Sequence, residues 1–520
     1  MKKTKIIALM LIAALLVVPF ASCADGSGTP GTSDSTDKQT ENDSSKEEIP
    51  LKIDLADTDI SEYTVVYSES GLDFNIHAAG YIAEEIYRLS PGTTVKIGLD
   101  TETPETENEI VIGKTNRSIS ADAENADLKD MEYLIERSGK KVLLYGEEYM
   151  VAAAARRLVN ELSHGKDIPE EKQVLTAEFE DPKNIIYIIG DGMGLNGLYY
   201  GKELYESNIY ISYDFPLPET GGYSQEEIIP LTFPNQGQVY THSADNDVTD
   251  GAASGTALAT GYKTYNGVIG LDTELKPVKN LVELAIEKGK KTAVITTNEK
   301  YSATAAAFTA HTLDRDDGDI ILWHQDTSGC DLIYWRLREP AMKLWDQLNE
   351  VTDEENGFFM MYEEGDFSRG VRDNYTGVYC IAYMRFNTSL RIFLEYAMYH
   401  PDTAIIIAAN HESGDIEYSE DLGGYQFMKD SRTGKNAPLL GIGKGTKEIN
   451  GATFDNTGVA KLVAKLMGED NFGDQSIPVT TENTGEETIP EEELEALAAK
   501  FKELSKAYKD EKIANAPKIS

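Results

Sequence analysis

The stretch Asn184-Ile185-Ile186-Tyr187-Ile188-Ile189, followed by Gly190-Asp191-Gly192-Met193-Gly194, decides the fold of this chain. A continuous apolar run of this kind is typical of a strand in a parallel sheet, because such strands are buried on both faces. The glycines end the strand and place Asp191 at its carboxyl end, the edge at which ligands bind in open α/β sheets. The alternative interpretation of Asp191 is a turn or capping residue.

Further strands and helices alternate along residues 183–475. Segments 292–297 and 404–409 have the composition of buried strands, and segment 278–288 has the apolar spacing of an amphipathic helix. This alternation predicts an α/β fold with a doubly wound, mostly parallel sheet sandwiched by helices.

Residues 49–181 predict a smaller α/β unit ahead of this sheet. Its strands are expected at 63–67, 109–113 and 141–145, and its helices at 76–89 and 149–162. The segment 109–117 resembles accessory α/β domains found beside bacterial carbohydrate-active enzymes. We expect a packing or spacing unit here and assign no active residue to it. Residues 476–520 predict a polar linker and a charged C-terminal helix at 491–509, which is expected to be solvated, with packing on the sheet or on a partner as the alternative.

The amino terminus has the pattern of an export signal. Lys2, Lys3 and Lys5 precede an apolar run at 6–20, and Ala21-Ser22-Cys23 follows. Small residues before a lone cysteine predict a bacterial lipoprotein signal peptide (residues 1–23), lipidation of Cys23 and attachment to the membrane at the cell surface. Ordinary secretion stays open, because Phe20 stands where Leu or Val is commoner. The polar segment 24–48 is expected to be a disordered tether.

The charge balance restricts the partners. The 520 residues include 48 Lys and Arg against 89 Asp and Glu, a formal net charge of −41. Nucleic acids are bound by concentrated positive charge, so a nucleic-acid partner is excluded. After Cys23 only Cys330 and Cys380 remain, which could pair but do not form a disulfide framework.

The run of small residues Asp250-Gly251-Ala252-Ala253-Ser254-Gly255 is the most informative segment for function. It resembles the nucleophile segment of the alkaline phosphatases, in which an Asp-Ser-Ala triplet opens a helix. Gly251 stands at the position of the serine, beside Asp250, and has no oxygen to accept a phosphoryl group. Ser254 lies about one turn deeper and is a poor substitute. A helix starting at Gly251 would also offer backbone N–H groups to an anion.

The resemblance covers roughly residues 183–467 in several separated segments and implies a sheet carrying two zinc ions and one magnesium ion. The magnesium positions match Asp191, Thr304 and Glu364, with Glu363 as the competitor if the alignment shifts by one. Together they form the all-oxygen set that Mg²⁺ prefers. Arg315 falls on the arginine that clamps the substrate phosphate through its planar fork. Taken alone, it would be a surface salt-bridge residue.

The zinc positions depart from the family. Arg369, Asp373 and Arg432 occupy three of them, and arginine has no lone pair to give a metal. The other site keeps His411 but has Asn410 in place of an aspartate, which makes it weak at best. The resemblance therefore implies magnesium and at most one zinc ion. The three replacements sum to one positive charge, as does a zinc ion with one aspartate and two neutral histidines. The alternative for Arg369 is an ion pair with an acidic neighbour.

Three functions remain open. The leading hypothesis is a surface lipoprotein of this family with impaired or lost phosphomonoester hydrolysis, whose old active site binds a phosphate-like anion or a phosphorylated small molecule through Arg315, Arg369 and Arg432. The second is an active phosphomonoesterase that uses residual metal and a water nucleophile. The third is a binding protein in which the N-terminal unit acts. Because family members are often dimers, a homodimer is also expected.

Overall fold

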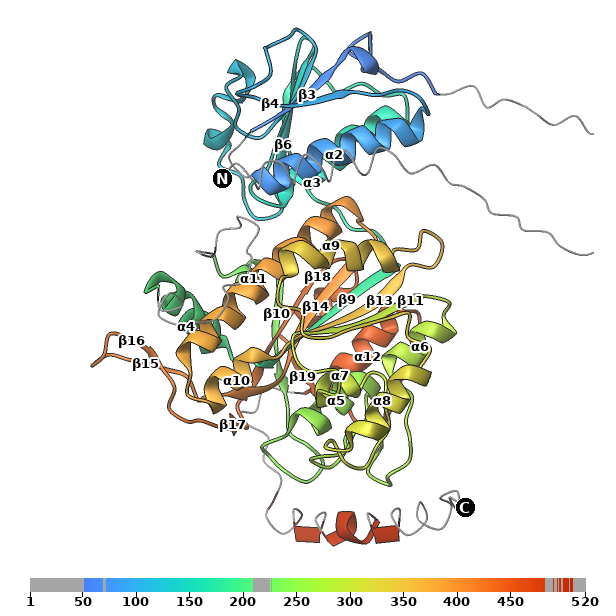
Figure 1. Cartoon of the computed structure of the whole chain (residues 1–520), viewed down its shortest axis with the longest axis vertical. Coiled ribbons are helices and arrows are strands. Elements are labelled where there is room, and N and C mark those ends of the chain that lie inside the picture. The colour runs from blue at the N-terminus through green and yellow to red at the C-terminus, as the bar shows by residue number, and fades with distance from the viewer. Residues whose placement is uncertain are drawn as a thin grey trace, which may run out of the picture.

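The computed structural model describes residues 51–68, 72–208, 225, 227–481 and parts of 490–507. The predicted signal peptide, Cys23 and the tether lie outside these residues. Two α/β units follow each other along the chain, each built around its own sheet (Figure 1). The first sheet lies within residues 64–176, and the second begins at Asn184.

The second sheet positions the site, and β9 (Asn184–Gly192) lies near its centre. Five strands run parallel in the order β12-β11-β13-β9-β14, and the order continues through β18-β10-β19-β20. β18 is antiparallel to both β14 and β10, and β17 pairs with the end of β14. The bounds are β10 (Asn235–Tyr240), β11 (Lys291–Thr296), β12 (Leu332–Tyr334), β13 (Phe358–Glu364), β14 (Thr403–Ser413), β17 (Arg432–Thr433), β18 (Ala437–Ile442), β19 (Thr453–Asp455) and β20 (Thr480–Thr481).

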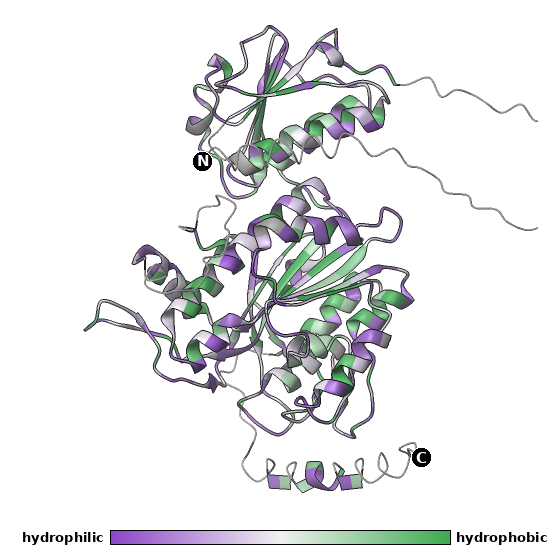
Figure 2. Ribbon diagram, viewed as in Figure 1, coloured by the Kyte–Doolittle hydropathy of each residue, from purple (hydrophilic) through white to green (hydrophobic). Residues whose placement is uncertain are grey.

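Helices cover both faces of this sheet, which confirms the predicted doubly wound α/β fold. One face carries α4 (Leu195–Glu206), α9 (Pro340–Val351), α10 (Asp366–Arg372) and α11 (Thr376–Tyr399) (Figure 1). The other carries α5 (Gly251–Thr260), α6 (Leu281–Glu287), α7 (Ala303–Ala306), α8 (Gly318–Thr327) and α12 (Asn456–Leu466). The strands between them are hydrophobic (Figure 2), and Ile185 to Ile189 are fully buried. Burial on both faces explains the uninterrupted apolar run.

The first sheet has the strand order β4-β3-β5-β7-β6-β8, in which β6 and β8 are antiparallel to their neighbours. Its elements are β3 (Thr64–Tyr67), α2 (Leu72–Leu89), β4 (Lys96–Leu99), β5 (Glu109–Ile112), β6 (Glu132–Ser138), β7 (Lys141–Tyr145), α3 (Met150–Ser163) and β8 (Lys172–Thr176). Two short hairpins, β1 (Asp54–Leu55) with β2 (Thr58–Asp59) and β15 (Glu417–Ser419) with β16 (Gly424–Gln426), stand apart from the sheets.

The two units pack through helices. The ring of Tyr81 on α2 lies 4.5 Å from that of Tyr399 on α11. On the same helix α11, Arg391 donates a 2.8 Å hydrogen bond to Glu148 of the first unit. Most buried apolar side chains of the two units form one continuous cluster, so the first unit is fixed to the second by a shared core.

Some local features differ from the sequence predictions. β14 continues to Ser413, four residues beyond the expected strand, because its end pairs with β17. α6 begins at Leu281, since Asn280 caps it. The described residues between 493 and 507 are helical, as expected, but Phe501 packs on Tyr265 at 4.6 Å, so the helix is docked on the second unit and not fully solvated.

Two further observations concern the cysteines and the membrane. Cys330 and Cys380 are both free thiols. Among the described residues, no helix combines the length and apolar character needed to span a bilayer.

Candidate active site

Asp191 stands at the carboxyl end of β9 and is the centre of a buried polar cluster. Its Oδ1 accepts a 2.8 Å hydrogen bond from Nδ2 of Asn410 and lies 3.2 Å from Nε2 of His411. Burial alone would raise the pKa of Asp191, but the hydrogen bond from Asn410 and the charge of Arg432 hold it below its usual range. The carboxylate is therefore ionised at neutral pH and can bind a cation.

Asn410 and His411 lie in an irregularity of the ladder between β14 and β9, where the register shifts between Ala409 and Glu412. Bulges of this kind re-aim side chains beside active sites. Oδ1 of Asn410 accepts from the backbone N–H of Gly192 at 3.1 Å, and Nδ2 donates to Asp191 and, at 3.0 Å, to Thr304. The opposite amide orientation would set two donors face to face at Gly192. Asn410 thus presents N–H groups to the cluster and not the oxygen expected of a metal ligand.

Arg432 on β17 reaches the same place from the opposite strand. Its Nε donates to Nε2 of the fully buried His411 at 3.0 Å. That nitrogen is the one whose lone pair a metal ion at Asp191 would need. A guanidinium N–H therefore stands where a coordinated cation would otherwise face His411. On the far side of the ring, the hydroxyl of Ser413 lies 3.2 Å from Nδ1.

Glu363, not Glu364, lies on the side of β13 that faces Asp191. Burial, followed by the charge of Asp191, raises the pKa of Glu363 to about 8, while the hydroxyls of Thr296 and Thr304 act in the opposite direction. Thr304, on α7, also receives the hydrogen bond from Asn410. The structure thus brings Asp191, Thr304 and Glu363 together.

Glu364 faces the opposite side, because neighbouring residues of a strand point to opposite faces. Its two carboxylate oxygens are bound by Arg385 of α11, with 3.0 Å from Nε to Oε2 and a short contact from Nη2 to Oε1. Arg385 also donates to Asp366 at 2.8 Å. This corrects the assignment of Glu364 to the magnesium set. The sequence analysis did not identify Arg385, although an arginine among the apolar residues of a long helix could have indicated a buried ion pair.

Gly251 begins α5 directly beside this cluster. A Cβ placed on Gly251 would lie 3.3 Å from Oγ1 of Thr304, 3.7 Å from Nδ2 of Asn410 and 3.8 Å from Nη1 of Arg315. A side chain at this position would therefore point at three polar groups of the site. Because residue 251 is a glycine, no side-chain oxygen at this position faces these groups.

Arg315 is held beside Gly251 by Asp250. Its Nη1 donates to Oδ2 of Asp250 at 2.8 Å, and about a third of its side chain is exposed. Asp250 also accepts from the backbone N–H groups of Ala252 and Ala253, so these first donors of α5 are capped and not available to an anion. The hydroxyl of Ser254 donates to the backbone carbonyl of Asn410, which removes it as a substitute nucleophile.

A model of the alkaline phosphatase family matches residues 182–334 of this chain. Alkaline phosphatase H of Pseudomonas aeruginosa is 39% identical over 139 residues, which are 26% of this chain and 26% of that protein. Alkaline phosphatase 4 of Drosophila melanogaster is 37% identical over 153 residues, 28% of this chain and 23% of that protein. Residues 182–334 of this chain are therefore similar to the alkaline phosphatase family. The matched region spans only about a quarter of the length of these curated relatives.

Solved alkaline phosphatases show similarity over a longer region. The structure of the enzyme from the Antarctic bacterium TAB5 covers 56% of this chain and 99% of its own, with 22% identity and a TM-score of 0.47. The structure from Thermus thermophilus covers 62% of this chain and 96% of its own, with 14% identity and a TM-score of 0.49.

Asp191, Glu363 and Thr304 present oxygens of the kind that Mg²⁺ prefers. Asp191 and Glu363 are two buried carboxylates close enough for one to raise the pKa of the other, and a divalent cation between them would remove that repulsion. The hydroxyl of Thr304 adds a third oxygen from a third element. Mg²⁺ commonly takes one or two carboxylates and completes its shell with water. When bound, it would supply positive charge to an anionic ligand.

The family's zinc ions do not fit the residues present. The described residues contain no group of three or more His, Cys, Asp or Glu side chains placed to share a metal ion. Asn410 presents N–H groups, and Nε2 of His411 is bound by Arg432. We therefore derive no chemistry from zinc at this site.

Arg369 lies on α10 in an acidic setting. Its guanidinium is 3.6 Å from Asp366 and 3.6 Å from Asp373, and Asp373 is shared with Arg372. These ion pairs match the alternative interpretation of Arg369. The contacts of the described residues place Arg432, but not Arg369 or Asp373, at the Asp191 cluster.

Proposed function

We propose that this protein binds a phosphate-like anion between Arg315 and Arg432 and hydrolyses phosphomonoesters slowly or not at all. The observation that carries this proposal is Gly251, whose missing side chain would point at Thr304, Asn410 and Arg315. The acceptor of the family's reaction is absent at this position.

The charges of the site support an anion that binds together with Mg²⁺. The positive charges of Arg315 and Arg432 are balanced by the ionised Asp250 and Asp191, while Glu363, whose pKa is raised to about 8, is mostly protonated at neutral pH. A bound Mg²⁺ would give this group of side chains a net positive charge, even if it displaces the proton of Glu363. We therefore expect phosphate to bind in the presence of Mg²⁺ and weakly in its absence.

Calorimetric titration of the full chain with inorganic phosphate, with and without Mg²⁺, tests the proposal. Arg315→Ala and Arg432→Ala should each weaken binding at least tenfold, on the order of the loss of a charge-assisted hydrogen bond. Arg336→Ala is the matched control, because Arg336 is exposed and pairs with Glu299. Unchanged phosphate binding in both site variants would contradict the proposal. So would rapid turnover of a chromogenic phosphate ester by the unaltered protein.

A second function, metal-dependent hydrolysis by a bound water, is favoured by the intact Asp191, Thr304 and Glu363 cluster. Turnover of a chromogenic phosphate ester that requires Mg²⁺ and disappears in Asp191→Ala would establish it over the first.

We also propose that the chain is anchored by lipid at Cys23. The support is the basic and apolar sequence of residues 2–20 followed by Ala21-Ser22-Cys23. Fatty-acid labelling of the unaltered protein, and its loss in Cys23→Ser, is the corresponding test.

A further inference from the structure

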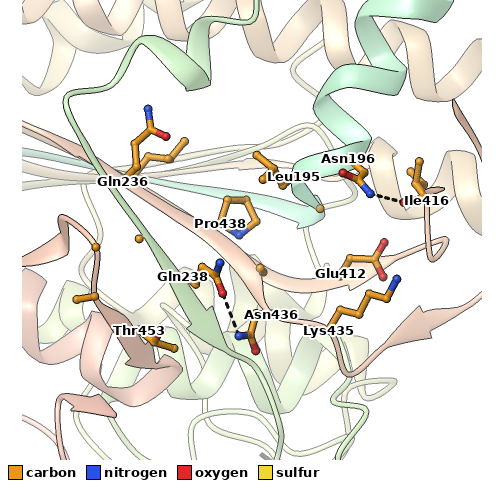
Figure 3. Close-up of a pocket in the computed structure, with 16 residues that line it drawn as sticks. Leu195, Asn196, Gln236, Gln238, Glu412, Ile416, Lys435, Asn436, Pro438 and Thr453 are labelled. Carbon is orange, nitrogen blue, oxygen red and sulfur yellow. Dashed lines mark hydrogen bonds between the residues drawn. The ribbon is translucent and has the colours of Figure 1, made fainter. Parts of the chain in front are cut away.

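A cavity separate from the Asp191 cluster opens beside the start of α4 (Figure 3). Its volume is about 410 Å³, within the range of small-molecule sites. The walls come from the first turn of α4, from β10 and β18, and from the loop before β19. Glu412, next to His411 on β14, is its link to the site already described.

Carboxamides supply much of its polar lining: Asn196, Gln236, Gln238 and Asn436. Oε1 of Gln238 accepts from Asn436 at 3.1 Å, and Nδ2 of Asn196 donates to the carbonyl of Ile416 at 2.8 Å (Figure 3). Among the described residues these bonds leave Nε2 of Gln238 as a donor and Oδ1 of Asn196 as an acceptor. The cavity therefore offers both kinds of hydrogen-bonding group without a net charge.

The charged side chains of the lining are already paired. Glu412 accepts from Thr433, and Lys435 contacts Asp415 and, at 3.2 Å, Glu417. The remaining walls include apolar side chains such as Leu195, Pro438 and Leu440. An anionic ligand would find no unpaired cation here, because Lys435 is already held by two carboxylates. A purely apolar ligand would leave the carboxamides desolvated and unsatisfied.

A platform of tyrosines, Tyr199, Tyr418 and Tyr425, includes two residues on segments that continue from the cavity lining, α4 and the strand β15 after Ile416. Tyr199 lies one turn beyond Leu195 and Asn196 on α4, and its ring stacks on Tyr425 of β16 at 6.0 Å with an 11° interplanar angle. Tyr418 of β15, two residues after Ile416, contacts Tyr425 edge-on at 5.3 Å. Tyr199 is 40% exposed and Tyr418 is 55% exposed. The β15–β16 hairpin that carries two of these rings projects from the body of the unit (Figure 1).

We propose that this cavity and its tyrosine platform bind a neutral carbohydrate. Hydroxyl groups of a sugar both donate and accept hydrogen bonds, as the carboxamides of the lining do. The C–H face of a pyranose ring packs on the electron-rich face of an aromatic ring, and exposed tyrosines supply such faces with little loss of conformational entropy. The site is distinct from the anion site and does not depend on it.

Ligand-observed NMR and titration of the full chain with neutral glucose, galactose, mannose and N-acetylglucosamine oligosaccharides test this proposal. Tyr418→Ala should weaken the affinity for the oligosaccharide about three- to tenfold, the range expected for one aromatic contact. Gln238→Glu keeps the acceptor for Asn436 but removes the Nε2 donors. This substitution should weaken the affinity for the oligosaccharide at least as much as Tyr418→Ala does. Tyr87→Ala is the matched control, because Tyr87 is 53% exposed and lies on the other unit. Inorganic phosphate should bind all three variants as it binds the unaltered protein.

Three results would overturn the proposal: no oligosaccharide of the panel bound with a Kd below about 10 mM, equal binding by Tyr418→Ala and Tyr87→Ala, or a dimer in sedimentation that Tyr418→Ala dissociates. The last result would assign the platform to contact between copies of this chain. Thermal unfolding of each variant separates loss of ligand from loss of fold.

Discussion

Restoring the missing hydroxyl with Gly251→Ser isolates what the site has lost. The new Cβ would lie 3.3 Å from Oγ1 of Thr304 and 3.8 Å from Nη1 of Arg315. The first contact is tight, and a shift of a few tenths of an ångström by the Thr304 hydroxyl would relieve it. A serine hydroxyl in this direction could hydrogen-bond to Arg315 or Asn410. The substitution therefore returns the acceptor oxygen to the centre of the cluster.

The effect of Gly251→Ser on folding should be small. Replacing a helical glycine removes about 0.5–1 kcal/mol of backbone entropy cost, which stabilises the protein. One close contact in a packed site costs on the order of 1 kcal/mol, at the low end of measured overpacking. The free energy of unfolding by denaturant should thus change by no more than about 1 kcal/mol. A much larger loss would mean that the site cannot accept a side chain at this position.

Activity should nevertheless stay low in this variant. A serine hydroxyl needs a base or a metal to become a nucleophile, and proton transfer alone is worth about 10²–10⁴-fold. Arg432 occupies the place from which a metal would act, and it cannot accept a proton. We expect the turnover of a chromogenic phosphate ester to rise no more than about tenfold, because the variant still lacks the proton transfer that activates a serine. If Gly251→Ser alone, treated with chelator, reached a kcat of about 1 s⁻¹ or more, typical of enzymes, the reasoning about Arg432 would be refuted.

Three further predictions concern charge. Arg385→Leu should destabilise the protein by about 3–5 kcal/mol in denaturant titration, because it leaves a buried Glu364 unpaired. The exposed Arg336→Leu should cost at most about 1 kcal/mol, and equal losses would contradict the buried pair. Mg²⁺ should raise the Tm of the unaltered protein and of Glu364→Gln but not of Glu363→Gln; the opposite result would return Glu364 to the magnesium set. Although burial acts against it, the Ala253 N–H and Arg315 keep the pKa of Asp250 below its usual range, so its stabilisation is present above about pH 4 and is lost as the pH falls through the depressed pKa. Asp250→Asn should make the acid loss of stability shallower, and an unchanged pH profile of unfolding would exclude this contribution.

The sheet could be predicted from the sequence because its strands are buried on both faces. The apolar run from Ile185 to Ile189 requires such a setting. The predicted end of the strand before Gly190 was wrong, because β9 continues to Gly192 through its pairing with β14. The ends of strands that are fixed by pairing with distant segments were harder to predict from the sequence. The extension of β14 to Ser413 depends on its pairing with β17, which lies about twenty residues further along the chain.

Site residues could be predicted from the sequence where the identity of a single residue was enough. They were harder to predict where the alignment of a strand with its neighbours determines which side chain faces the site. The position of Gly251 follows from its place at the start of a helix of small residues. The choice between Glu363 and Glu364 depends on which side chain points to the same face of the sheet as Asp191, and a one-residue shift reverses it. Arg369 illustrates a third case, because its ion pairs with Asp366 and Asp373 depend on how α10 is oriented.

The departures at 410 and 432 explain each other physically. Asn410 Nδ2 lies 2.8 Å from the carboxylate of Asp191. An aspartate at 410 would set two carboxylates at that distance, an arrangement that is stable only with a cation between them or a shared proton. Once an arginine at 432 binds His411 and no metal is held there, the amide is the side chain that satisfies both Asp191 and the N–H of Gly192. The reverse follows as well: Asn410→Asp in the present protein should raise the pKa of this carboxylate pair and destabilise the fold at neutral pH, unless Arg432→His restores a place for the metal.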